Sequence, residues 1–174
     1  VGMVVAEGDT NVPMRMSMQG FSPWTPENPY LYDFSVTMGE DRVESYFGMR
    51  KFELKEDEAG IKRLFLNDKP YFHNGVLDQG YFPDGLFLPA RPEEYERDIL
   101  RMKELGFNML RKHIKVEAEE FYYQCDKLGM VVFQDMVNNG KYSYIRDTVL
   151  PTVARISQKM PDQLLHSDEN TRRE

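Results

Sequence analysis

Polar and charged side chains gather at three places in the second half of the sequence, each directly after a segment that we expect to be a β-strand. These places are Asn74–Gly80, Arg111–His113 and Gln134–Met136. They offer carboxylates, amides, a guanidinium and an imidazole, groups that can bind hydroxyls or hold a reacting carboxylate. Because the loops after parallel strands meet at one end of a sheet, we expect the three stretches to lie together.

Arg111 and Asp135 are the strongest candidates for a direct contact. Arg111 follows a strand that we expect to be buried, so its charge requires a carboxylate, and Asp135 follows the next strand along the chain. Two interpretations stay open: a structural ion pair, or direct contact with a substrate. His113 likewise is either a ligand or proton carrier, or a loop histidine that only donates a hydrogen bond.

Other chemistries have little support in the sequence. The three histidines, His73, His113 and His166, match no compact zinc motif. Cys125 lies at a helical position that we expect to be buried, without a paired base, and is not expected to be a nucleophile. No glycine-rich phosphate loop occurs, which removes the simplest nucleotide-binding interpretation. We expect neither a metal nor a cofactor. Trp24 could stack on a sugar or fill a junction between domains.

Composition narrows the partners. The 174 residues carry 22 Lys and Arg against 29 Asp and Glu, a net charge of -7, without a basic run, which argues against nucleic acid. No apolar stretch approaches the ~20 residues that a membrane span needs. The N-terminus resembles neither a protein start nor a signal peptide, and we expect a cut through a longer protein. A single cysteine leaves the compartment open.

The first part of the chain has a β pattern. We expect strands over Val12–Met18, Tyr30–Met38 and Val43–Phe52, with a hairpin turn at Gly39–Asp41. The proline-rich stretch Ser22–Pro29 is expected to be a loop or an edge, because proline cannot donate to a sheet.

The second part begins with a β pattern and then changes to alternating helices and strands. We expect a hairpin of Ile61–Leu66 and Tyr71–Val76, joined by Asn67–Pro70. We expect helices over Pro92–Leu105 and Glu117–Leu128, each followed by a strand, Phe107–Leu110 and Met130–Phe133. Gly106 and Gly129 each separate a helix end from a strand start, which indicates repeated βα units. An open doubly wound sheet and a closed barrel both remain compatible with that repeat. A loop over 137–140 and a helix start over 167–174 complete the expectations.

Several of these stretches together resemble one known family. Trp24–Tyr32 followed by Phe47–Arg50 is similar to the end of the immunoglobulin-like domain of glycoside hydrolase family two, which includes β-galactosidases, β-glucuronidases and β-mannosidases. Further stretches resemble the start of that family's barrel: Asn67–Pro70, Asn74–Val76, Met102–Asn108, Leu110–Arg111 and Cys125–Gly129. The resemblance covers Phe21–Asp135.

The resemblance implies an α+β chain. Residues 1–54 would be the C-terminal part of an immunoglobulin-like β-sandwich, and residues 55–174 the first βα units of an incomplete (β/α)8 TIM barrel. It also implies retaining hydrolysis by two glutamates, one in an Asn-Glu pair after strand four and one near strand seven. Neither is present in this sequence. We therefore expect no catalytic residue here, and an isolated chain without activity.

The site residues implied by the resemblance form one wall of a sugar pocket. Asp78 and Gln79 would recognise hydroxyls, Arg111 would hold a catalytic carboxylate, and Asp135 would orient Arg111 or bind a hydroxyl. His113 follows strand two and would also line the substrate site. The stretches Leu77–Gly80 and Lys112–Lys115 depart from the usual family motifs, which favours a different glycoside as substrate.

The expected partners are a carbohydrate substrate and the remainder of a parent chain, with a homo-oligomer kept open. An exported bacterial parent would place the chain in the periplasm or outside the cell. Two alternatives remain. The chain could be a carbohydrate-binding or interaction module that uses Trp24 and Phe121–Tyr123, or a complete small α+β protein.

Overall fold

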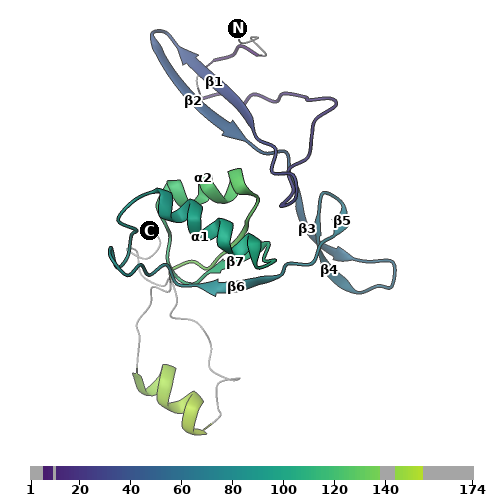
Figure 1. Cartoon of the computed structure of the whole chain (residues 1–174). Coiled ribbons are helices and arrows are strands. Elements are labelled where there is room, and N and C mark those ends of the chain that lie inside the picture. The colour runs from purple at the N-terminus through teal and green to yellow at the C-terminus, as the bar shows by residue number, and fades with distance from the viewer. Residues whose placement is uncertain (1–5, 10, 138–143, 155–174) are drawn as a thin grey trace.

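The computed structural model describes residues 6–9, 11–137 and 144–154. Its strands form three sheets, two antiparallel and one parallel (Figure 1). The first holds β1 (Tyr32–Met38) and β2 (Asp41–Phe47), the second β3 (Phe52–Glu56), β4 (Lys62–Leu66) and β5 (Lys69–Pro70), and the third β6 (Gly75–Asp78), β7 (Met109–Lys112) and β8 (Val131–Gln134). The helices are α1 (Glu93–Glu104), α2 (Glu119–Leu128) and the π-helix η1 (Ile145–Ala154).

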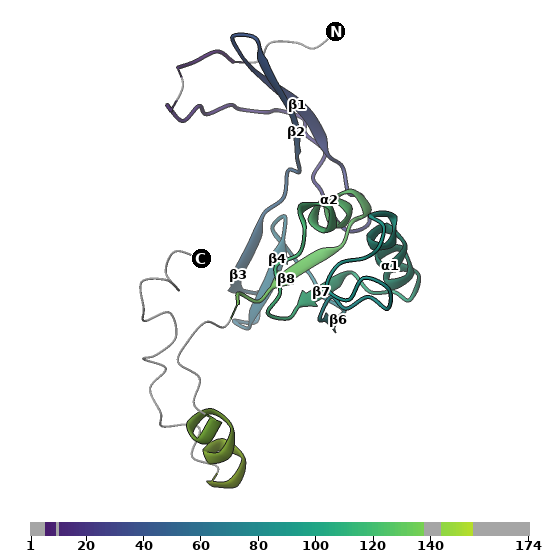
Figure 2. The same cartoon turned by 90° about the vertical axis from the view of Figure 1, so that its left-hand side faces the viewer.

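The parallel sheet positions the predicted site. Helix α1 connects β6 to β7, helix α2 connects β7 to β8, and both helices cover the same face of the sheet (Figures 1 and 2). Val76, Leu110 and Val132 are paired across the three strands, so their side chains share that face. They pack with buried side chains of both helices, including Ile99 and Phe121, to form the core. The repeated βα units expected from the sequence are confirmed.

The helix ends follow the residues that the sequence places there. Acidic side chains occupy the first turn of both helices, where the helix dipole favours negative charge. Gly106 and Gly129 follow the two helices with φ of 87° and 79°, a left-handed conformation that glycine adopts without steric cost. The two expected helices are therefore confirmed within two residues at each end.

The hairpin of β1 and β2 extends away from the helices and the parallel sheet (Figures 1 and 2). Its turn lies at Gly39, where φ is 62°, as expected. Phe34, Val36 and Val43 lie on one face of the hairpin and are exposed in the described part of the chain.

Three strand expectations were wrong. Val12–Met18 forms no strand, and no described strand pairs with it. The expected strand Val43–Phe52 is interrupted at Gly48–Lys51, where pairing changes from β1 to β4. The pairing therefore changes before residue 54, where we expect the boundary between the two domains, and Leu54 itself lies within β3.

The third correction concerns Tyr71–Val76. Asn67 and Asp68 both have positive φ, so the chain reverses within two residues and β4 pairs with Lys69–Pro70. Residues Gly75–Asp78 are thereby free to join the parallel sheet as β6. The expected loop beyond residue 137 and the expected helix start at 167–174 lie outside the described residues.

Trp24 joins the proline-rich loop to the helices. Its side chain is fully buried, and its indole Nε1 donates to the carbonyl of Asp126 in α2 at 2.7 Å. The Arg50 guanidinium lies 4.5 Å from the indole ring centre and binds the Asp126 carboxylate at 2.5 Å. Stacking of Trp24 on a sugar is therefore ruled out, and its expected role at a junction fits these contacts.

Within the described ranges, no helix is both long and apolar enough to cross a membrane.

Candidate functional site

Strand β7 places adjacent side chains on opposite faces of the parallel sheet. Leu110 and Lys112 are buried toward the helices, whereas Arg111 lies on the open face with about half of its side chain exposed. Leu77 and Phe133 are paired with Arg111 and share that face. The strand was expected to be buried and to end before Arg111; instead β7 includes Arg111 and is buried only on its helix side, because no described element covers the open face.

Arg111, His113 and Asp135 meet on the open face at the carboxyl ends of β7 and β8. Arg111 Nη2 lies 2.9 Å from Asp135 Oδ2, and Arg111 Nε lies 3.0 Å from the same oxygen. His113 Nδ1 lies 3.1 Å from Asp135 Oδ2. Because an ionised carboxylate only accepts hydrogen bonds, Nδ1 carries the proton in this contact. We call these three residues the Arg111 cluster.

The two donors set the charge state of Asp135. Hydrogen bonds from Arg111 and then His113 lower the pKa of the Asp135 carboxyl below its usual value. The same contact raises the pKa of the Arg111 guanidinium. The Arg111 cluster therefore presents an ion pair and an imidazole whose Nε2 has no hydrogen-bond partner among the described residues, a combination suited to hydroxyls and carboxylates.

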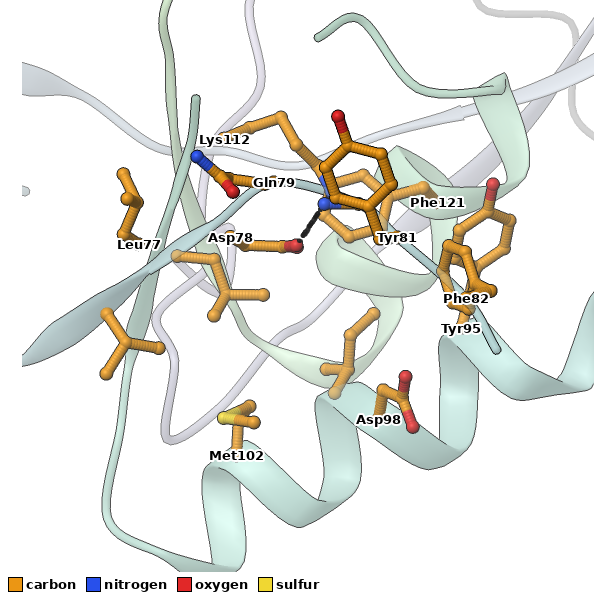
Figure 3. A pocket seen from close by; sticks show the side chains of 14 residues that line it. Leu77, Asp78, Gln79, Tyr81, Phe82, Tyr95, Asp98, Met102, Lys112 and Phe121 are labelled. Atoms are coloured by element: carbon orange, nitrogen blue, oxygen red, sulfur yellow. Dashed lines mark hydrogen bonds and ion pairs between the residues drawn. The ribbon is translucent and has the colours of Figure 1, made fainter. Parts of the chain in front are cut away.

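Asp78 and Gln79 lie apart from the Arg111 cluster. Asp78 is paired with Lys112 in the sheet register and points toward the helices, where its Oδ2 binds Lys112 Nζ at 2.7 Å (Figure 3). Gln79 is exposed beyond the end of β6. Of the five predicted site residues, the structure brings together Arg111, His113 and Asp135.

A cavity of about 400 Å³ lies between the end of β6 and helix α1 (Figure 3). Its lining is mostly apolar and includes Tyr95, Ile99 and Phe121, with the charged groups Asp78, Asp98 and Lys112. It lies on the helix face of the sheet, whereas the Arg111 cluster lies on the open face.

Three charged residues near the site, Lys112, Lys115 and Glu117, were not predicted as site residues from the sequence. Lys112 Nζ lies 2.7 Å from Glu117 Oε1, and Lys115 Nζ lies 2.9 Å from the same oxygen. The side chains of Lys112 and Glu117 are 1% and 0% exposed. The two-residue alternation of a strand was an available signal, because it places Lys112 on the same face as the apolar Leu110.

The other side chains that could act as nucleophiles or metal ligands do not form a site among the described residues. Cys125 is buried in the core as expected, and burial raises the pKa of its thiol. Burial also lowers the pKa of His73, which contacts the Phe133 ring. Among the described residues, no three His, Cys, Asp or Glu side chains gather in a way that could hold a metal ion.

Comparison with known proteins gives one consistent family. The family model described as Glycosyl hydrolases family 2 matches residues 3–50. A β-galactosidase of Thermoanaerobacter pseudethanolicus is 28% identical over 138 residues, which are 76% of this chain and 18% of the relative. A probable β-mannosidase of Caenorhabditis elegans is 28% identical over 139 residues, which are 73% of this chain and 15% of the relative.

A solved structure of a family 2 enzyme has a similar fold. A family 2 β-galacturonidase from Eisenbergiella tayi superposes on 71% of this chain and 21% of its own, with a TM-score of 0.63 and 21% identity. The fold is thus a mixed α/β arrangement shared with enzymes of this family. The chain is thus similar to family 2 glycosyl hydrolases, as its resemblance implied, and spans about a fifth or less of the length of these relatives.

Proposed function

We propose that this chain contributes one wall of the sugar-binding pocket of a retaining family 2 glycoside hydrolase. The observation that carries the proposal is the convergence of Arg111, His113 and Asp135 at the carboxyl ends of two parallel strands. In βα folds of this kind, substrates bind at that end of the sheet. The relatives named above, a β-galactosidase and a probable β-mannosidase, act on β-glycosides.

The proposed architecture follows the family resemblance. Residues 1–54 correspond to the end of an immunoglobulin-like sandwich, and the change of strand pairing at residues 48–51 lies just before this boundary. Residues 55–174 correspond to the first βα units of a (β/α)8 barrel, in which β6, β7 and β8 are the first three strands. The family match to residues 3–50 and the parallel order of β6, β7 and β8 support this division.

In this proposal the two catalytic glutamates come from outside these 174 residues. Retaining glycosidases need two carboxyl groups about 5 Å apart, one as nucleophile and one as acid/base. The only carboxylate of the Arg111 cluster, Asp135, is already bound by Arg111 and His113. Arg111 then acts on a catalytic carboxylate or on a charged sugar, and His113 accepts a sugar hydroxyl through Nε2.

The purified chain tests both halves of this proposal. On a panel of nitrophenyl β-glycosides we expect no turnover above a mock-purified control. With millimolar methyl glycosides and uronides, we expect NMR shifts at Arg111 and His113 that Arg111→Ala removes. Arg42→Ala is the matched control, because Arg42 forms an exposed ion pair with Glu44 in the hairpin. Turnover by the chain, or sugar-dependent shifts confined to other residues, would contradict the proposal.

A carbohydrate-binding module without a catalytic partner is the alternative. This alternative needs exposed aromatic side chains that stack on sugar rings, but Trp24 and Phe121 are both buried. We therefore favour the pocket-wall proposal.

A further inference from the structure

A group of four charged side chains, two of them fully buried, lies on the helix face of the parallel sheet, behind the Arg111 cluster. It consists of Asp78, Lys112, Lys115 and Glu117, and we call it the buried charge cluster. Lys112 Nζ contacts Asp78 and Glu117 at 2.7 Å each, and Lys115 Nζ contacts Glu117 at 2.9 Å. Two positive and two negative charges cancel within it.

The buried charge cluster is closely surrounded. Tyr95 donates its hydroxyl to Glu117 Oε2 at 3.2 Å, and Lys112 Nζ lies 4.4 Å from the centre of the Phe121 ring. A Cβ atom on Gly80 would lie 2.1 Å from Glu117 Oε1. Buried ion pairs contribute little net stability compared with apolar side chains of similar volume, because desolvation offsets their attraction. The contribution of these ion pairs is therefore expected in the backbone geometry that they hold.

The geometry in question is that of the segment between β7 and α2. Ile114 has a φ of 46°, a left-handed conformation that strains a β-branched residue. The chain is held on both sides of it. The His113 amide donates to the carbonyl of Asp78 at 2.9 Å, and the Lys115 carbonyl accepts from Gln134 Nε2 at 3.0 Å. Lys115 Nζ also donates to the carbonyls of Gly80, at 2.7 Å, and Phe87.

We propose that Lys115 and Glu117 are positioning residues that hold the strained turn at Ile114, and that this turn brings the His113 imidazole onto Asp135. Lys112 anchors the same carboxylate from within β7, one residue after Arg111. The buried charge cluster thus acts on the Arg111 cluster through the backbone, without contacting a ligand. The role as part of a sugar site rests on the proposed function, whereas the positioning itself does not.

The test is the ¹⁵N spectrum of the His113 imidazole in the full 174-residue chain, assigned with His113→Gln. We expect wild type to show a protonated, hydrogen-bonded Nδ1. Lys115→Met should lose this signature while Lys112 keeps both carboxylate partners, and Lys115→Arg should restore it because the cation returns. Lys55→Met is the matched control, since Lys55 pairs with Glu53 and Asp68 in a different sheet and contacts neither cluster. An unchanged His113 signature in Lys115→Met would overturn the proposal.

A double variant separates positioning from general loss of structure. Glycine adopts positive φ without strain, so Ile114→Gly added to Lys115→Met should recover the His113 signature. Failure of the double variant to recover it would also overturn the proposal. Sugar titration gives an independent readout. If no saccharide binds but the His113 signature still follows Lys115 and Ile114, the proposed function fails while the positioning role stands.

Discussion

At the scale of single residues, charge placement decides what the open face of the sheet can bind. Arg111 and Lys112 are neighbours in sequence, yet strand alternation sends one to the open face and the other to the buried charge cluster. Arg111 then pairs with Asp135, and Lys112 pairs with Asp78 and Glu117. Arg111 and Lys112 share no carboxylate, so any coupling between the two faces must pass through the backbone and not through a common ion pair.

The pKa of the Asp135 carboxyl should therefore depend on Arg111 and not on distant arginines. Arg111→Ala removes the main cause of its lowered pKa, so we expect that pKa to rise toward the usual value. Because the folded-state pKa is lowered, the stabilising effect of the pair is present above the unfolded-state pKa and is lost as pH falls through the folded-state value. Carboxyl ¹³C NMR between about pH 2 and 6 measures this.

Arg111→Lys should have an intermediate effect, since a lysine keeps the charge but not the forked geometry. Arg42→Ala should leave the Asp135 titration unchanged, because its only ion-pair partner among the described residues is Glu44. An Asp135 titration that Arg111→Ala does not move would show that the ion pair is absent in solution.

At the scale of elements, the helices and the parallel strands β7 and β8 were predictable, whereas β6 and the antiparallel strands were less so. Helix periodicity and the glycines at 106 and 129 are local signals, and the helix bounds followed from them. The end of the Val43–Phe52 strand depends on which partner strand is available, which no local signal records. Arg111, His113 and Asp135 were predictable from strand ends, whereas Asp78 was misplaced because its face of the sheet was not considered.

Gly80 gives a test of how closely the loop after β6 packs on the buried charge cluster. Gly80 and Gly20 have the same φ of 66°, but a Cβ on Gly20 has nothing within 4 Å, whereas one on Gly80 overlaps Glu117 Oε1. Both alanine variants incur the backbone cost of about 1 kcal/mol. We expect Gly80→Ala to lose a further ~2 kcal/mol in urea unfolding through overpacking. Equal losses in the two variants would show that the loop moves away freely.

At the scale of the whole molecule, a polar and aromatic joint ties the proline-rich loop to the ends of both helices. Lys103 of α1 donates to the carbonyls of Pro26 and Gly129, at 2.7 and 3.0 Å. Trp24 and Arg50 both reach Asp126 of α2. The sequence indicated that Trp24 is unusual but not its partners, because these contacts join residues up to 102 positions apart.

Removal of Trp24 should therefore weaken the structure as a whole. Truncating a fully buried aromatic side chain costs about 3–5 kcal/mol, and here Asp126 also loses a hydrogen bond to its carbonyl. We expect Trp24→Ala to lower the free energy of unfolding by that amount, measured by far-ultraviolet circular dichroism in urea. Phe72→Ala is the control: its ring is 81% exposed, so a change within about 0.5 kcal/mol is expected. If Trp24→Ala matched that control, the joint would contribute no stability, and the contacts of Asp126 with Trp24 and Arg50 would be incidental to the fold.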